Sequence, residues 1–225
     1  MAIARGVAGR IAPAVDIAAG VSQKDHRLEK QRRAVREVIG PQRALVIDAN
    51  CGWDADTAIH CLRELAGCNI TVMEQPTPDG DYEQIVRVRR ECGVKVMADD
   101  MCFNLAHAQE LIRNQACDLI SVYPGKNGGI RKSREIVQYA ERHGVGCTIG
   151  SNLEWDVATA AMGHLIVATP NLRVEDYPGD IHGPAYYEFR IVQEPLSIVG
   201  PVTTITSRPG LGVEVDWPLV RELTS

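Results

Sequence analysis

The chain has 225 residues, of which 45% are hydrophobic and 24% charged, a composition typical of one globular domain and unlike that of a disordered segment. Its net charge of −5 is spread along the sequence, which argues against a nucleic-acid or membrane-binding surface and favours a small-molecule ligand. No apolar run approaches the ~18 residues of a membrane span, and no signal-peptide core opens the chain, so we expect a cytoplasmic protein.

Seven cysteines are scattered along the sequence without any CxxC pair. An odd number with this spacing predicts neither a disulfide framework nor a zinc knuckle. We expect the cysteines to be reduced packing residues.

From about residue 43, short β-branched runs alternate with longer amphipathic stretches, a pattern typical of a parallel α/β sheet. A unit begins about every 25 residues, which suits a (β/α)8 TIM barrel and also an open doubly wound sheet. The predicted strands are 44–50, 70–76, 95–100, 119–125, 146–152 and 172–177, and the predicted helices are 25–40, 54–66, 82–92, 105–115, 130–143 and 155–168.

Three acidic residues fall at the same point of successive units. Asp48, Glu74 and Asp99 are separated by 26 and 25 residues, so each is expected at the carboxyl end of its own strand. In a barrel these ends converge on one mouth, where active sites are built, whereas in an open sheet they line an edge. Clustered carboxylates repel one another unless a cation lies between them, so the spacing predicts a hard divalent ion, Mg²⁺ first and Mn²⁺ second.

At these residues the sequence resembles the enolase superfamily, in its mandelate racemase and muconate lactonizing enzyme branch. The resemblance rests on an ordered series of strings that spans roughly residues 22–218: VIDANCGWD, MEQPTPDGD, MADD, KNGGI, GSNLE and PGLGVEVD. It implies that Asp48, Glu74 and Asp99 hold a metal that binds a substrate carboxylate. A lysine or histidine base then removes the proton on the adjacent carbon to give a metal-stabilised enediolate. Asp100 is expected beside the metal ligands, with the roles of Asp99 and Asp100 open to exchange.

The sequence departs from the family at its N-terminal end. Relatives carry a KxK pair on the second strand, and the matching segment, VDIAAG at 15–20, has no lysine. The length also leaves no room for the family's N-terminal capping domain. The resemblance therefore implies a truncated member, with strands three to eight intact and the second doubtful. Its parts would be an atypical segment 1–20, a partial barrel 21–200 that carries the metal site, and a closing segment 201–225. A barrel that lacks strands exposes sheet edges, so we expect a homo-oligomer.

Acid–base candidates come from the ends of the later strands. Tyr123 stands where relatives carry a lysine or aspartate, and a tyrosine acts as acid or base only if its pKa of about 10 is lowered; packing or substrate contact is the other interpretation. Glu154 and Glu175 are the remaining catalytic candidates. Asn152, Lys126 and Asp176 are predicted to bind substrate, although Lys126 also suits a structural place at a helix entrance and Glu175 with Asp176 suits a solvated loop.

Three functions remain open at this point. The favoured one is a Mg²⁺-dependent dehydratase, a lyase that acts on a small hydroxylated carboxylate, because one base and a metal suffice for it. The alternative within the superfamily is a racemase, epimerase or cycloisomerase, which needs groups on both faces of the substrate carbon. The third is a truncated barrel that has no activity.

Overall fold

The computed structural model describes residues 15–18, 34–177, 179–200 and 202–225. Its main sheet contains six strands in the order β1-β2-β3-β4-β5-β6, and neighbouring strands from β1 to β5 pair in parallel. The strands are β1 (Val15–Ala18), β2 (Leu45–Asp48), β3 (Ile70–Glu74), β4 (Lys95–Ala98), β5 (Leu119–Val122) and β6 (Gly146–Ile149).

The order of these strands decides between the two predicted architectures. A doubly wound sheet reverses its strand order at a switch point, whereas a barrel adds each strand beside the previous one. Here the spatial order is the chain order, as in a barrel. Among the described strands the barrel does not close, because β1 and β6 each have a single neighbour.

A helix follows most of the strands. The main helices are α2 (Ala55–Glu64), α3 (Tyr82–Glu91), α4 (Leu105–Arg113), α6 (Ile130–Arg142) and α7 (Asp156–Ala168), with a short α5 (Pro124–Asn127) after β5 and a 3₁₀ turn η1 (Ala66–Cys68) after α2. These bounds lie within a few residues of the predicted ones. No described helix combines the length and the apolar character that crossing a bilayer requires.

The chain divides into two compact units. The N-terminal unit comprises Ala12–Ser121 with Tyr139–Cys147, and the C-terminal unit comprises Val122–Gln138 with Thr148–Ser225.

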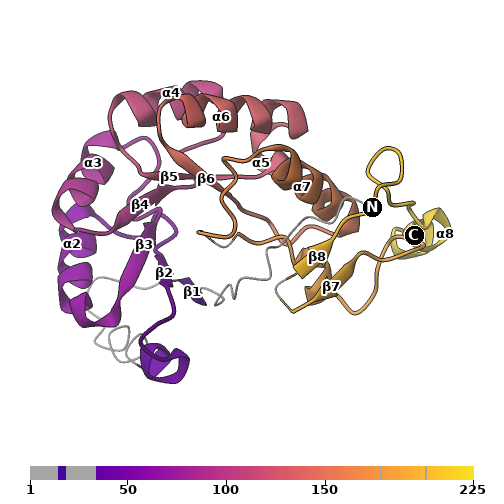
Figure 1. The fold of residues 1–225 in the computed structure, drawn as a ribbon, viewed down its shortest axis with the longest axis horizontal. Helices are drawn as coiled ribbons and strands as arrows, with labels where there is room; N and C mark the ends of the chain where they lie inside the picture. The colour runs from indigo at the N-terminus through magenta and orange to yellow at the C-terminus, as the bar shows by residue number, and fades with distance from the viewer. Residues whose placement is uncertain (1–14, 19–33, 178, 201) are drawn as a thin grey trace. The chain divides into compact units, whose positions relative to one another are not determined.

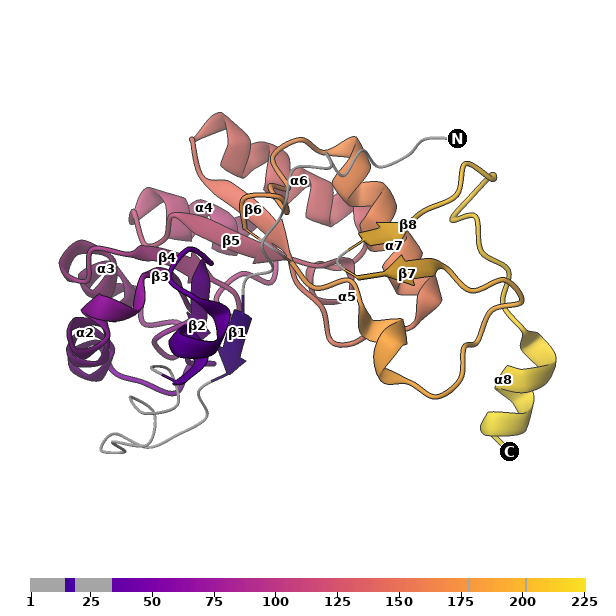
Figure 2. The same ribbon diagram turned by 60° about the horizontal axis from the view of Figure 1, so that its bottom comes forward.

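In the N-terminal unit, helices α2, α3 and α4 lie along one face of the strands (Figures 1 and 2). The strands are apolar and covered, since Leu45, Ile47, Met73 and Val96 have no exposed surface. Burial of such side chains contributes roughly 1.5–3 kcal/mol each, which is what holds short strands of high apolar content in a sheet.

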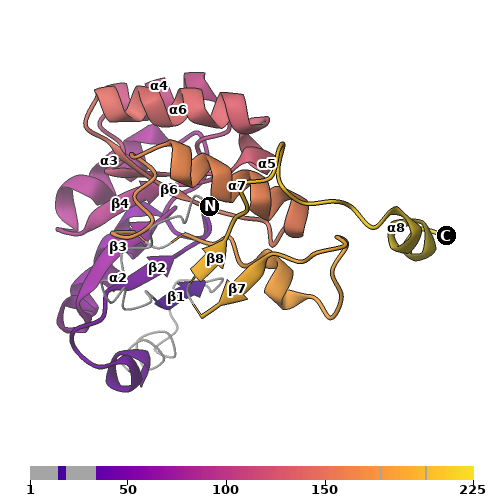
Figure 3. The ribbon, with the colours of Figure 1, turned by 45° about the vertical axis from the view of Figure 1, so that its right-hand side comes forward.

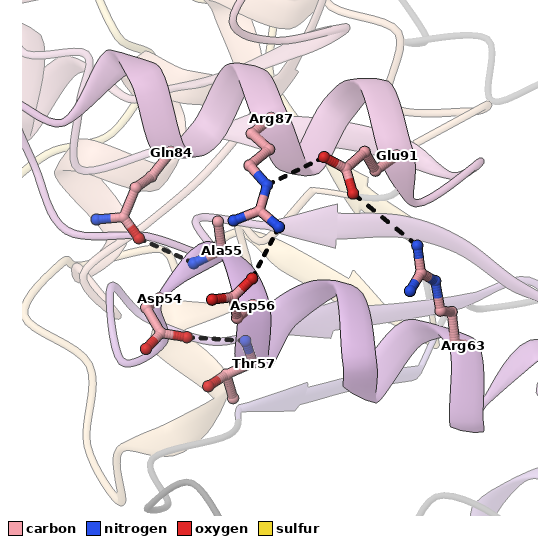
Figure 4. Close-up of polar contacts among 8 residues, drawn as sticks. All are labelled: Asp54, Ala55, Asp56, Thr57, Arg63, Gln84, Arg87 and Glu91. Carbon is pink, nitrogen blue, oxygen red and sulfur yellow. Dashed lines mark hydrogen bonds and ion pairs between the residues drawn. The ribbon is translucent and has the colours of Figure 1, made fainter.

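Polar contacts fix the ends of α2 and α3 (Figure 4). Asp54 caps α2 by accepting a hydrogen bond from the backbone N–H of Thr57 at 2.8 Å, which satisfies one of the unpaired N–H groups of the first turn. Gln84 accepts from the N–H of Ala55 at 2.9 Å, and Arg87 pairs with Asp56 at 2.7 Å. The first turn of α2 is therefore joined to the first and second turns of α3.

The C-terminal unit contains α7, the 3₁₀ turn η2 (Gly183–Tyr186) and the antiparallel hairpin of β7 (Ser197–Val199) and β8 (Val202–Thr204). Figure 3 shows the hairpin strands side by side and α8 (Trp217–Leu223) at the end of an extended segment. Gly163 lets α7 approach the chain after β8, because a Cβ atom there would collide with the side chain of Ile205.

Three sequence expectations need comment. The strand predicted at 172–177 is wrong: residues 174–176 form a turn, in which the N–H groups of Asp176 and Tyr177 donate to the carbonyl of Arg173 at 3.1 and 2.8 Å. The doubtful second strand does exist as β1, which pairs with β2. Of the helix predicted at 25–40, residues 34–39 are helical and 25–33 lie outside the described residues.

All seven cysteines are free, and Cys68, Cys102, Cys117 and Cys147 are buried. The prediction of reduced cysteines that serve mainly in packing is confirmed for these four. Cys51, Cys61 and Cys92 are partly exposed.

Candidate functional site

Three acidic residues stand at the carboxyl ends of adjacent strands in the N-terminal unit, and we call Asp48, Glu74 and Asp99 the acid edge. Asp48 closes β2 and Glu74 closes β3, and the two are Cα partners in the parallel pairing. Glu74 is in turn the partner of Met97 in β4, so Asp99 lies two residues further along. The spacing seen in the sequence therefore corresponds to a shared position in the sheet.

Backbone hydrogen bonds continue across the acid edge after the strands have ended. The N–H of Ala49 donates to the carbonyl of Glu74 at 3.2 Å, and the N–H of Gln75 donates to the carbonyl of Met97 at 2.9 Å. The segments that carry the acids are thus tied to one another and are not independent loops.

Asp48 already accepts two hydrogen bonds within its own turn. Its Oδ1 accepts from the backbone N–H of Asn50 at 2.7 Å, and its Oδ2 accepts from Asn50 Nδ2 at 2.8 Å. An ionised carboxylate offers about four lone-pair sites, so these two bonds orient Asp48 and leave acceptor capacity for another group.

The thiol of Cys51 lies near several carboxylates at this end of the sheet. Its pKa is raised to about 12, first by burial and then by Asp100, whose carboxylate accepts a hydrogen bond from the thiol at 3.4 Å. Asp79 and Asp48 raise it further. Carboxylates from three segments of the chain thus add to burial in disfavouring the charged thiolate.

The donor set fits a hard divalent ion in its chemistry, because Mg²⁺ and Mn²⁺ prefer carboxylate oxygens. Within the described ranges, however, no three His, Cys, Asp or Glu side chains are gathered into a metal-binding group. The strand pairing establishes the backbone register of the acid edge. That its three carboxylates converge on one ion stays a prediction.

In the C-terminal unit, two of the predicted residues are brought together. The carboxylate of Glu154 accepts a hydrogen bond from the backbone N–H of Asn152 at 2.8 Å through Oε2. Gly125, at the start of α5, makes room for this arrangement, since a Cβ there would lie 2.9 Å from Glu154 Oε1 and 3.9 Å from Asn152 Nδ2. The polar ends of Asn152 and Glu154 consequently lie against the chain that follows β5.

Tyr123 and Lys126 form a second contact in the same unit. Lys126 Nζ lies 4.2 Å from the centroid of the Tyr123 ring, a cation–π geometry. Tyr123 is 6% exposed, and its backbone N–H donates to Asn127 Oδ1 at 2.9 Å. These contacts support the packed interpretation of Tyr123 and the structural interpretation of Lys126, and the catalytic role of Tyr123 remains untested.

Glu175 and Asp176 lie in the exposed turn that replaces the predicted strand. Asp176 Oδ2 accepts from Arg173 at 2.8 and 2.6 Å, so this carboxylate is engaged locally. The expectation that both acids close a strand was wrong because the Arg173 guanidinium and two backbone bonds favour the turn.

The structure also describes part of the segment in which the sequence lacks the expected KxK pair. Ala18 is the Cα partner of Asp48, and the strand that holds it reads VDIA. No lysine occurs in β1, as the sequence indicated.

Several functional candidates escaped the sequence reasoning. Gln75 follows Glu74 directly, and its signal was a second polar residue at the end of a mainly apolar strand. Gly125 and the buried carboxylate of Asp156 gave no such signal, because their neighbours Glu154 and Arg190 are distant in the sequence.

Comparison with known proteins shows which family the chain resembles. The family model described as "Enolase C-terminal domain-like" matches residues 6–219. Muconate cycloisomerase 1 of Rhodococcus opacus is 30% identical over 96% of this chain and 54% of its own length. An L-Ala-D/L-Glu epimerase of Clostridium acetobutylicum is 32% identical over 82% of this chain and 51% of its own length. The chain thus spans about half the length of the curated relatives that it matches.

Solved structures agree. Muconate lactonizing enzyme from Pseudomonas putida superposes with a TM-score of 0.85 at 25% identity, covering 92% of this chain and 56% of that one. A dipeptide epimerase from Enterococcus faecalis gives a TM-score of 0.82 at 28% identity, over 89% of this chain and 57% of that one. The parallel strand order and the match along nearly the whole chain identify the protein as a member of the enolase C-terminal domain-like family, in the mandelate racemase and muconate lactonizing enzyme branch of the enolase superfamily.

Proposed function

We propose that this chain is the barrel part of a Mg²⁺-dependent enzyme that removes a proton from the carbon next to a carboxylate. The observation that carries the proposal is the register of the acid edge: Asp48 and Glu74 are direct partners, and Asp99 follows the next strand. Such a proton is very weakly acidic unless the resulting negative charge is stabilised, so a site that gathers acids around a cation suits this reaction.

Asp48, Glu74 and Asp99 would hold the ion. When bound, a divalent ion supplies the positive charge that offsets the negative charge building up on the substrate carboxylate. Asn50 would keep Asp48 oriented through the two hydrogen bonds described above. Manganese satisfies the same oxygen donors and is the second choice.

Glu154 is the leading candidate for moving a proton in this proposal. Its carboxylate is half-buried and is held at one oxygen by the N–H of Asn152, which leaves the other oxygen beside Gly125. Tyr123 and Glu175 remain weaker candidates, because the ring of Tyr123 is packed against Lys126 and Glu175 lies in an exposed turn.

The overall reaction is proposed to be an isomerisation, with dehydration as the second candidate. Relatives named as cycloisomerases and epimerases support isomerisation of a small carboxylate. The absence of lysine from β1 and the tyrosine at the end of β5 favour dehydration, since that outcome needs fewer basic groups. Both reactions share the proton-removal step, so one experiment tests what they have in common.

The test measures Mg²⁺ binding by calorimetry and hydrogen–deuterium exchange at the α-carbon of candidate carboxylic acids, including hydroxy acids and dipeptides. We expect the wild-type chain to bind Mg²⁺ and Glu74→Gln to weaken that binding at least about tenfold, because one ligand charge is lost. Glu110→Gln, on helix α4, removes the same charge away from the acid edge and is expected to bind normally.

The metal assignment is contradicted if the wild-type protein binds no Mg²⁺. It is also contradicted if Glu74→Gln binds Mg²⁺ as tightly as the wild type does. Metal binding without α-proton exchange in any acid supports the third possibility, a barrel without activity. Among positive results, inversion or cyclisation of the substrate identifies an isomerase and loss of water identifies a dehydratase.

A further inference from the structure

Gln75 occupies an unusual position directly after Glu74. It is 1% exposed although its side chain is polar, and its backbone φ is +30°, in a region that residues other than glycine rarely adopt. A buried carboxamide persists only where its donors and acceptor are satisfied, and an unfavourable φ persists only where the surroundings impose it.

The side chain of Gln75 spans from the end of β3 to the chain that follows β4. Its Oε1 accepts hydrogen bonds from the backbone N–H groups of Asp99 at 2.8 Å and Met101 at 3.3 Å. Its Nε2 donates to the carbonyl of Thr77 at 2.8 Å, which fixes the orientation of the carboxamide. The oxygen therefore faces the acid-bearing turn after β4, and the nitrogen faces the loop of Gln75 itself.

The main chain of Gln75 adds two further links. Its N–H donates to the carbonyl of Met97 at 2.9 Å, and its carbonyl accepts from the N–H of Cys51 at 2.9 Å. Gln75, which directly follows β3, is thus bonded to the segments that follow β2 and β4, so it contacts all three parts of the chain that carry the acid edge.

We infer that Gln75 is a positioning residue, whose carboxamide fixes the backbone of Asp99 relative to Glu74. An apolar side chain of the same length would fill the space but would leave two N–H groups and one carbonyl without their partner. The turn after β4 would then settle elsewhere, and the Asp99 carboxylate would move with it. The effect on Mg²⁺ affinity rests on the proposed function, whereas the effect on the backbone does not.

The matched pair of variants is Gln75→Met and Gln84→Met. Gln84 also joins two segments, by accepting from the N–H of Ala55 at 2.9 Å and donating to Asp81 at 2.6 Å, and both of these partners lie outside the acid edge. Amide hydrogen exchange measured by NMR reports the backbone, with Ile85 and Val88 of α3 as reference amides for global opening. Calorimetry with Mg²⁺ alone reports the metal site.

In the wild type, we expect the amides of Asp99 and Met101 to be protected although they lie beyond the last residue of β4. In Gln75→Met, their exchange should rise at least about tenfold relative to the reference amides, and Mg²⁺ binding should weaken about tenfold, as is typical when a residue that orients a ligand is lost. Gln84→Met should leave both quantities at their wild-type values.

Unprotected amides at Asp99 and Met101 in the wild-type protein overturn the inference, and this measurement decides it even if Gln75→Met does not fold. The inference is also overturned if the Asp99 and Met101 amides exchange at the wild-type rate in Gln75→Met. It is overturned as well if the wild type binds Mg²⁺ and Gln75→Met binds it equally tightly. If the wild type binds no Mg²⁺, the proposed function fails, and the exchange data alone decide whether Gln75 positions Asp99.

Discussion

Cys51 illustrates how burial and nearby carboxylates, chiefly Asp100, act on a single residue. Burial and the neighbouring carboxylates both disfavour its thiolate, which places its pKa near 12 against an ordinary value of 9.0. Because the folded pKa lies above the unfolded one, the protonated thiol contributes stability that is complete below about pH 9 and is lost as the pH rises towards 12.

The corresponding prediction concerns alkylation. At pH 9, Cys51 should react with iodoacetamide more slowly in the folded chain than in the unfolded chain, since the thiolate is the reactive form. Asp100→Asn should speed the reaction by lowering the pKa, although not to the unfolded rate, because burial is the largest cause of the shift. Mass spectrometry of the alkylated peptide measures the rate.

Cys92 is the internal control for this experiment. Burial also raises its pKa, but Asp100 is not among the causes. Its reactivity should therefore be the same in both proteins. Equal rates at Cys51 in wild type and Asp100→Asn would show that Asp100 does not act on the thiol.

At the scale of an element, helix α7 shows how a buried charged group is paired. Its first residue, Asp156, has no exposed surface, and its carboxylate pairs with the guanidinium of Arg190 through two nitrogens, one at 2.9 Å. The N–H of Leu196 also donates to Asp156 at 3.4 Å. The pair joins the start of α7 to the segment that precedes β7.

Removing one partner of a buried ion pair leaves an uncompensated charge. We therefore expect Asp156→Asn to lower the free energy of unfolding by about 3–5 kcal/mol, measured by urea denaturation. The Arg173–Asp176 pair provides the contrast, because both side chains are about half exposed, at 45% and 55%. Asp176→Asn should cost at most about 1 kcal/mol. A small effect of Asp156→Asn would mean that the buried pair does not anchor α7.

At the scale of the whole molecule, the order of the strands carries an expectation about assembly. Among the described strands, β1 and β6 have one neighbour each. The N–H of Asp180 already donates to the carbonyl of Ile149 in β6, so β1 is the strand whose edge is better placed to pair with another chain. We predict self-association, so that sedimentation equilibrium gives a mass above the 24.6 kDa of one chain and a value that rises with concentration. A single-chain mass at every concentration would contradict this prediction.

Much of the fold followed from local pattern. Five of the six predicted strands formed within a few residues of their expected bounds, because each combines β-branched residues with a helix signal on either side. The sixth, at 172–177, did not, since Arg173 forms a turn with Asp176 that no periodicity reveals.

The sequence by itself determined the parallel α/β class and the family. It also determined that Asp48, Glu74 and Asp99 occupy equivalent positions, because they are one βα repeat apart and each repeat contributes one strand end. Only the tertiary structure decided that Asp48 and Glu74 are direct partners, that Gln75 bonds to the backbone of Asp99, and that Gly125 lies against Glu154. These contacts join residues that are far apart in the chain. They depend on register and on close approach, which the spacing of residues along a sequence does not encode.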